Sequence, residues 1–173
     1  MSGFGGGEFR FEKNEVDGVH VQRHIEICTV HYLDVQVGQW YTWHKERVMD
    51  MTVNERIAAL RRKMDNSDID TCLIVTDDFH GSEYVGAYFK TRAFFSGFTG
   101  SAGSLLVTAE EAYLWTDGRY FLQAEQQLRG SGIQLMRAGQ PGVPTLAAFL
   151  AERMAAGGTL GFDGRTVSTQ LYR

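Results

Sequence analysis

Short strand-like runs that alternate with helical patterns constrain this chain more than any other feature. The runs occur at 71–75, 103–108, 112–116, 133–136 and 160–163. Helical patterns separate several of them, and Glu110-Glu111 forms a turn between the second and the third. Strands that alternate with helices around one hairpin predict an α/β fold, with a mixed β-sheet flanked by helices.

Three helices are predicted beside these strands, over 52–67, 119–128 and 144–156. Thr52 and Glu55 have the spacing of a capping box, which starts the first helix. Pro144 opens the third helix, at a position that tolerates a missing N–H. The inner faces are expected to consist of Ile57, Leu60, Met64, Phe121, Leu122, Ala124, Leu128, Leu146, Phe149, Leu150 and Met154.

The first fifty residues differ from the rest and are expected to be a leader or a β-rich extension, with a second unit over 51–173. Apolar residues alternate with polar ones over 19–37, which predicts a strand with one buried face. Four residues of zinc-ligand type lie here, namely His20, His24, Cys28 and His31. Together they could hold zinc. Residues four apart on a strand are about 13 Å from each other, however, so a polar strand face is favoured.

Charge and cysteine content argue against several classes of protein. The chain has 17 Lys and Arg against 21 Asp and Glu, a net charge of −4, which disfavours a nucleic-acid binder that relies on a basic surface. No apolar run approaches the roughly 18 residues of a membrane helix, and no secretory signal pattern is present. Cys28 and Cys72 make no disulfide framework, so the cytoplasm is the expected compartment.

A polar segment follows the first buried run, at a position where sites gather in α/β sheets. Its candidate side chains are Asp77, Asp78, His80, Ser82 and Glu83. Carboxylates and a histidine could act as acid and base or bind a metal. This leaves open a hydrolase that uses Asp77, Asp78 and Glu83 with one metal ion. Neighbouring carboxylates tend to diverge, so a capping or loop-pinning role is favoured.

The glycine-rich stretch over 97–103 could bring backbone amides close to a phosphate group. No Lys-Ser/Thr pair follows it, so it is not a P-loop. It also precedes a strand, whereas a dinucleotide-binding fingerprint precedes a helix. We interpret it as a structural tight turn.

Two clusters combine basic and aromatic residues. Arg119 is expected in the first turn of a helix, where the dipole disfavours a cation, so it needs a carboxylate, a neighbouring subunit or a substrate as partner. A salt bridge to Asp117 is favoured, and either Asp117 or Thr116 can cap the helix. Lys90 and Arg92 beside Phe94-Phe95 are interpreted as a solvated edge. With no nucleophile–base arrangement visible, the residues alone indicate a soluble α/β domain with a polar site at one sheet edge.

The same segments resemble a known family. The motifs lie in order at Asp77–Val85, Phe95–Gly103, Leu114–Ala124, Gly139–Thr145 and Gly161–Asp163. From about Asn54 to Arg173 the chain resembles the first, non-catalytic domain of three-domain Xaa-Pro aminopeptidases (aminopeptidase P), the creatinase/prolidase N-terminal domain.

The resemblance implies a parent enzyme that removes the N-terminal residue from peptides with proline second. Its catalytic domain would lie beyond Arg173 and would hold two divalent metals, usually manganese, that activate a water molecule. None of those ligands can be placed in this chain, so no catalytic or metal-binding residue is assigned and the chain is expected to be inactive alone. The helix expected from Ser168 stops at Arg173, so the domain is expected to be cut short.

By the same resemblance, the domain shapes the mouth of the active site and takes part in homodimer contacts. Its partners would be the catalytic domain and the peptide substrate, with no nucleic acid and no membrane. His80, Arg92 and Arg119 are the candidates to face the substrate channel. The alternative is a non-enzymatic interaction module with the same fold, as in histone-chaperone relatives; the motif over 115–121 favours the peptidase.

Overall fold

The computed structural model describes residues 51–78, 82, 85–154, 157–164 and 166–167. The predicted N-terminal strand, the four zinc candidates between His20 and His31, and the helix expected from Ser168 lie outside the described residues. The proposed boundary at residue 51 stays a prediction.

A five-stranded mixed sheet forms the centre of the fold, in the order β4-β3-β2-β1-β5. The strands are β1 (Thr71–Val75), β2 (Ser104–Thr108), β3 (Ala112–Thr116), β4 (Gln134–Arg137) and β5 (Leu160–Phe162). β2 is antiparallel to both β1 and β3, whereas β4 is parallel to β3 and β5 is parallel to β1. The predicted mixed sheet and its hairpin are confirmed.

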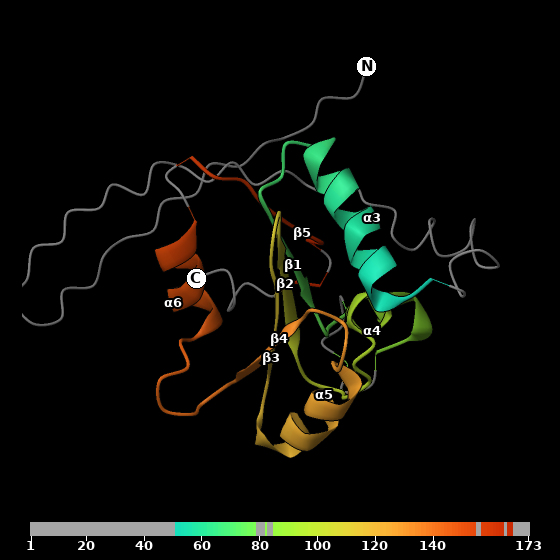
Figure 1. The fold of residues 1–173 in the computed structure, drawn as a ribbon, viewed down its shortest axis with the longest axis vertical. Helices are drawn as coiled ribbons and strands as arrows, with labels where there is room; N and C mark the ends of the chain where they lie inside the picture. Colours follow the sequence, from blue (N-terminus) through green and yellow to red (C-terminus); the bar gives the residue numbers. More distant parts are fainter. Residues whose placement is uncertain (1–50, 79–81, 83–84, 155–156, 165, 168–173) are drawn as a thin grey trace, which may run out of the picture.

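Helices cover both faces of the sheet, which Figure 1 shows edge-on with α3 and α4 on one side and α6 on the other. The helices are α3 (Val53–Asp65), α4 (Thr91–Ser96), α5 (Phe121–Gln127) and α6 (Leu146–Arg153), with short 3-10 turns η1 (Ala87–Phe89) and η2 (Gly118–Tyr120). Because the central strands are covered twice, their side chains are apolar on both faces: Leu105 and Leu114 lie in the core on the α3 side, Leu106 in the core on the α6 side.

The first helix follows its sequence signals closely. The Thr52 hydroxyl accepts from the amide of Glu55 at 3.3 Å, and the Glu55 carboxylate accepts from the amide of Thr52 at 2.7 Å. This capping box is confirmed. The hydrogen bonds that the Glu55 carboxylate accepts from the amide and the hydroxyl of Thr52 lower its pKa. Ile57, Leu60 and Met64 are buried on the inner face, as predicted.

The second predicted helix is partly wrong. Residues 118–120 form a 3-10 turn and the α-helix begins only at Phe121. Ala124 and Leu128, one turn apart, are buried against the sheet. Leu122 precedes Ala124 by two residues, which places it on the opposite side of the helix, and it is 76% exposed. The prediction that Leu122 lies on the inner face is therefore wrong.

The third helix starts slightly later than predicted. Thr145 is its N-cap and accepts from the amide of Ala148 at 3.1 Å, so Pro144 precedes the cap and does not open the helix. The Pro144 carbonyl accepts instead from the indole N–H of the buried Trp115 at 3.0 Å. Phe149 provides the buried contact of this helix, packed edge-on against Trp115. Within the described residues, no helix has the length and hydropathy needed to cross a bilayer.

Candidate functional site at the carboxyl ends of the strands

The direction of the strands brings the predicted site segments to one edge of the sheet. β1, β3, β4 and β5 all run the same way, so their carboxyl ends meet there, together with the start of β2. Residues 76–78, 97–103 and 116–119 therefore lie at the same edge. Functional sites of α/β sheets gather at such edges.

Arg92, from α4, lies at the centre of this edge and is only 3% exposed. Its Nη1 donates to the carbonyl of Phe98 at 2.8 Å, Nη2 donates to the carbonyl of Gly100, and Nε donates to the hydroxyl of Thr76. The guanidinium carbon lies 4.8 Å from the centre of the Phe98 ring. The interpretation of Arg92 as part of a solvated edge is therefore wrong, although Lys90 is exposed.

Burial lowers the pKa of Arg92 to about 10, while the nearby Tyr120 acts in the opposite direction. Arg92 is therefore still a cation at neutral pH. Its polar hydrogens are directed at acceptors inside the domain, so its predicted contact with substrate stays a prediction.

The glycine-rich segment is a tight turn, as interpreted from the sequence. Gly97 ends α4 in the left-handed conformation, with a φ of 71°. Gly100 packs so closely that a Cβ atom there would lie 2.3 Å from Cζ of the fully buried Phe98. A Cβ atom on Gly103 would lie 2.9 Å from the backbone oxygen of Trp115. These glycines let the turn pack against the sheet.

Side chains whose contacts the sequence does not predict hold the outer side of this turn. Ser101 Oγ and Tyr120 Oη lie 2.6 Å apart, and the amide of Thr99 donates to Gln127 Oε1 at 2.9 Å. The Thr116 hydroxyl donates to the carbonyl of Ala102 at 2.7 Å. These contacts link residues far apart in the sequence, so no local pattern predicts them.

Arg119 is exposed at the rim of the edge, with 70% of its side chain accessible. Its amide and its Nε donate to Asp117 Oδ1 at 3.0 and 2.9 Å, and its Nη2 donates to Oδ2 at 2.8 Å. The predicted cap and internal salt bridge are confirmed, and the hydrogen bonds from Arg119 lower the pKa of Asp117. Contact between Arg119 and a substrate stays a prediction.

The carboxylates after β1 act as turn-forming groups. Asp77 Oδ1 accepts from the amide of Asp78 at 2.9 Å, and Asp78 Oδ1 accepts from the amide of Ser82 at 3.0 Å. The loop-pinning role is thus confirmed for Asp78, stays a prediction for the Ser82 side chain, and concerns His80 and Glu83 outside the described residues. Among the residues that the structure describes, no group of three or more His, Cys, Asp or Glu could hold a metal ion.

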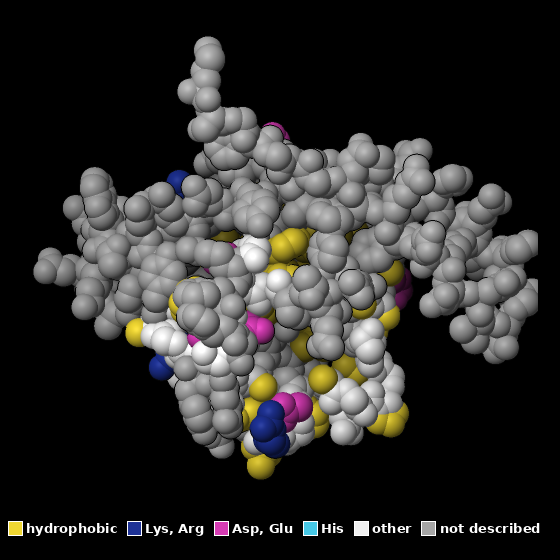
Figure 2. Space-filling model, turned by 180° about the vertical axis from the view of Figure 1, so that it is seen from behind, with side chains coloured by type: hydrophobic (Ala, Val, Ile, Leu, Met, Phe, Trp, Pro, Cys, Tyr) yellow, Lys and Arg dark blue, Asp and Glu magenta, His cyan; other side chains and the backbone are white. Residues whose placement is uncertain are grey.

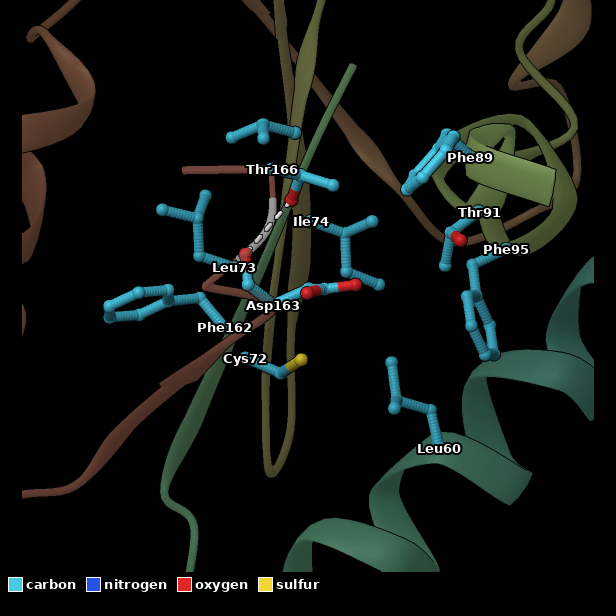
Figure 3. Close-up of a pocket in the computed structure, with 11 residues that line it drawn as sticks. Leu60, Cys72, Leu73, Ile74, Phe89, Thr91, Phe95, Phe162, Asp163 and Thr166 are labelled. Carbon is cyan, nitrogen blue, oxygen red and sulfur yellow. Dashed lines mark hydrogen bonds between the residues drawn. The ribbon is translucent and has the colours of Figure 1, made fainter. Parts of the chain in front are cut away.

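A hollow of about 40 Å³ lies on the α3 and α4 side of the sheet, beside β5. Figure 3 shows Cys72 and Ile74 of β1 directed toward Leu60 and Phe95 across it. Phe162 and Asp163, at the end of β5, complete the lining on the other side. Ligand pockets have volumes of roughly 300–1,000 Å³, so the hollow is too small for a peptide substrate.

The exposed side chains of the described residues show what the strand-end edge offers to a partner. In Figure 2 the basic side chains that can be seen lie at separate places, and the lowest of them lies beside acidic side chains. The strand-end edge is a rigid rim held by hydrogen bonds, and the guanidinium of Arg119 is exposed on it. Such a rim can bind or orient a partner group.

Comparison with known proteins shows the family. Residues 56–173 match the model of the creatinase/prolidase N-terminal domain. Aminopeptidase P2 of Arabidopsis thaliana is 49% identical over 115 residues, which are 65% of this chain and 16% of that protein. The Xaa-Pro aminopeptidase ApepP of Drosophila melanogaster is 41% identical over 109 residues, 63% of this chain and 18% of that protein.

Solved structures agree with this match. The X-prolyl aminopeptidase of Caenorhabditis elegans, a cytosolic enzyme with a di-nuclear active site, superposes with a TM-score of 0.63 at 37% identity. The match covers 69% of this chain and 21% of the worm protein. The N-terminal domain of a putative metallopeptidase from Corynebacterium diphtheriae has a TM-score of 0.52 at 23% identity, over 69% of this chain and 82% of that one, which shows the fold alone.

This chain belongs to the creatinase/prolidase N-terminal domain family, and it is the creatinase-type N-terminal domain of Xaa-Pro aminopeptidase-like proteins. It spans about a fifth or less of the length of the curated relatives it matches. In such relatives the domain accompanies a catalytic domain.

Proposed function

We propose that this domain is the non-catalytic part of an Xaa-Pro aminopeptidase and shapes the access of peptides to a catalytic domain. The parent enzyme would remove an N-terminal residue that precedes proline, with two divalent metals, usually manganese, held by the catalytic domain. The observation that carries the proposal is the strand-end edge, where hydrogen bonds join two motifs of the family, 95–103 and 114–124, into one rim.

Within this rim, Arg119 is the side chain we propose to face the substrate channel. It is exposed, fixed by Asp117 and stacked at 5.3 Å on the Tyr120 ring, so its guanidinium has a defined position. A guanidinium can donate to carbonyl or carboxylate groups of a peptide. His80 belongs to the same proposal from its place in the sequence motif, and Arg92 supports the rim from behind.

We further propose that the protein acts in the cytoplasm as a homodimer to which this domain contributes contacts. Leu122 supports this, because it is the large apolar side chain that remains exposed in the described part of the chain. Analytical ultracentrifugation of the 173-residue chain and of its Leu122→Gln variant tests whether Leu122 contributes to a dimer contact. A dimer that weakens in the variant supports it, and a wild type that sediments as a monomer at all concentrations refutes the contribution of this domain.

The role in substrate access is tested in a hybrid enzyme. Residues 56–173 replace the matching stretch of Arabidopsis aminopeptidase P2, and hydrolysis of an Xaa-Pro-Xaa peptide is measured. Arg119→Ala is expected to raise KM, with a smaller effect on kcat, because the guanidinium lies at the passage and away from the metal centre.

Arg153→Ala is the matched control for Arg119→Ala in the hybrid. Arg153 is also exposed, lies 3.6 Å from the carboxylate of Glu111 and stacks at 5.1 Å on Phe149, but it is carried by α6. We expect this variant to leave KM unchanged. Equal KM values for the hybrid and its Arg119→Ala variant would refute the role of Arg119 in substrate access.

A further inference from the structure

Arg92 carries a buried charge with an unusual set of partners. Arginine is almost never fully buried unless it is paired. The ion pairs formed between described residues involve Arg119, Arg137 and Arg153, and none of them includes Arg92. Within that part of the chain, the positive charge of Arg92 is therefore stabilised by neutral acceptors and by the ring of Phe98.

These acceptors belong to two segments, which the sheet joins only at the end of the turn, where Val75 pairs with Ser104. Thr76 follows β1, whereas the carbonyls of Phe98 and Gly100 belong to the turn over 97–103. Thr76 extends the network, because its hydroxyl and its amide donate to the carbonyl of Gly103 at 3.0 and 3.1 Å. The turn is thus held near its beginning, its middle and its end.

The planar guanidinium suits this task. Its donors point in fixed directions within one plane, so one side chain can serve three acceptors and still stack on a ring. A lysine carries its charge on one compact ammonium and cannot reach the same three acceptors. A salt-bridging role would call for a carboxylate partner, whereas the observed contacts all fix backbone or the Thr76 hydroxyl.

We propose that Arg92 is a positioning residue: it clamps the 97–103 turn onto the end of β1 and so fixes the Ser101–Tyr120 pair at the rim. In this proposal Arg92 acts through the turn, in place of the direct contact with substrate that the family resemblance predicts. The inference rests on the proposed function for its biological meaning, since that function places the rim at the substrate passage. The clamp itself is tested without any measurement of peptidase activity.

Hydrogen exchange of backbone amides in the 173-residue chain tests the clamp, with Arg92→Lys as the main variant. We expect amides over 98–103 to exchange about tenfold faster or more than in the wild type, since a charged hydrogen-bond donor set is lost. Amides of β2 and β3 should change by a much smaller factor. A purely stabilising role would instead raise exchange in the turn and the strands by the same factor.

Arg56→Lys is the matched control. Arg56 also lies on a helix, donates to a backbone carbonyl, that of Phe94, at 2.9 Å and stacks on an aromatic ring at 4.6 Å, but it does not contact the turn. Its replacement should leave the ratio of turn exchange to strand exchange as in the wild type. Selective loosening of the turn in this control, or unchanged turn amides in Arg92→Lys, would overturn the proposal.

Two further measurements apply if Arg92→Lys does not fold. Thr76→Val removes one acceptor of the clamp and keeps Arg92, and it should also accelerate exchange selectively over 98–103. In the unmodified chain, the Nη protons of Arg92 should give separate NMR signals, because their hydrogen bonds hinder rotation of the guanidinium. A single averaged signal for these protons would show that the clamp does not exist.

Discussion

Gly100→Ala should destabilise the domain strongly, although the change adds a single methyl group. An alanine Cβ would lie 2.3 and 2.8 Å from two atoms of the Phe98 ring and 2.9 Å from Cδ1 of Tyr120. Phe98 is fully buried and lies under the Arg92 guanidinium, so its ring cannot move away from an added methyl group. The backbone of Gly100 is outside the left-handed range, so the effect is steric.

The size of the effect follows from overpacking. Extra methyl groups in a packed core cost about 1–3 kcal/mol. One fully buried ring and one partly buried ring lie within 3 Å of the added Cβ, which places Gly100→Ala at about 2–3 kcal/mol. For a domain of this size, 1 kcal/mol lowers Tm by about 4 °C, so a decrease of about 8–12 °C is expected. Thermal and urea unfolding followed by circular dichroism measure both quantities.

Gly86→Ala is the control for this prediction. Gly86 has no heavy atom within 4 Å of an added Cβ, and its φ of −60° and ψ of 160° suit any residue. It should therefore change the stability by less than about 1 kcal/mol. In a Phe98→Leu background, Gly100→Ala should cost at least about 1 kcal/mol less than in the wild type. Equal stabilities of Gly100→Ala and Gly86→Ala would refute the reasoning.

Three further predictions concern single side chains. Leu114→Ala should lose about 2–5 kcal/mol because its side chain is fully buried, whereas Leu122→Ala should stay within about 0.5 kcal/mol; urea unfolding compares them. Burial raises the pKa of the Cys72 thiol from 9.0 to about 12. The stability that the neutral thiol contributes is therefore complete below pH 9 and is lost as the pH rises toward 12. Cys72→Ala removes this titration, so the free energy of unfolding of the variant should decline less over that range. Asp117→Ala should lower the free energy of unfolding by about 1 kcal/mol because a cap is lost, and Arg119→Ala should lower it by less than about 0.5 kcal/mol. The stability that ionised Asp117 contributes should disappear as the pH falls through its lowered pKa.

Local signals explain which parts of the fold could be predicted from sequence. Thr52 and Glu55 define a helix start within four residues, and the run over 71–75 is apolar because both faces of β1 are covered. Each of these features depends on neighbours in the sequence. The mixed sheet then follows from the order of strands and helices.

Non-local packing explains the errors. Leu122 is apolar and is therefore expected on the inner face of the helix. The 3-10 turn at 118–120, however, sets a helix phase in which Ala124 and Leu128 face the sheet. Arginine is normally exposed, so the sequence favours a solvated edge for Arg92. Its acceptors are backbone carbonyls and the Thr76 hydroxyl, and no sequence pattern marks those groups as partners.

The central claim is that this domain serves a catalytic centre located elsewhere. The most direct measurement gives one Xaa-Pro-Xaa peptide, with manganese, to the purified 173-residue chain and to the hybrid that carries residues 56–173 in Arabidopsis aminopeptidase P2. We expect the hybrid to release the N-terminal residue and the chain alone to leave the peptide intact. Cleavage by the chain alone that a chelator abolishes, or a folded and metal-loaded hybrid without turnover, would contradict the account.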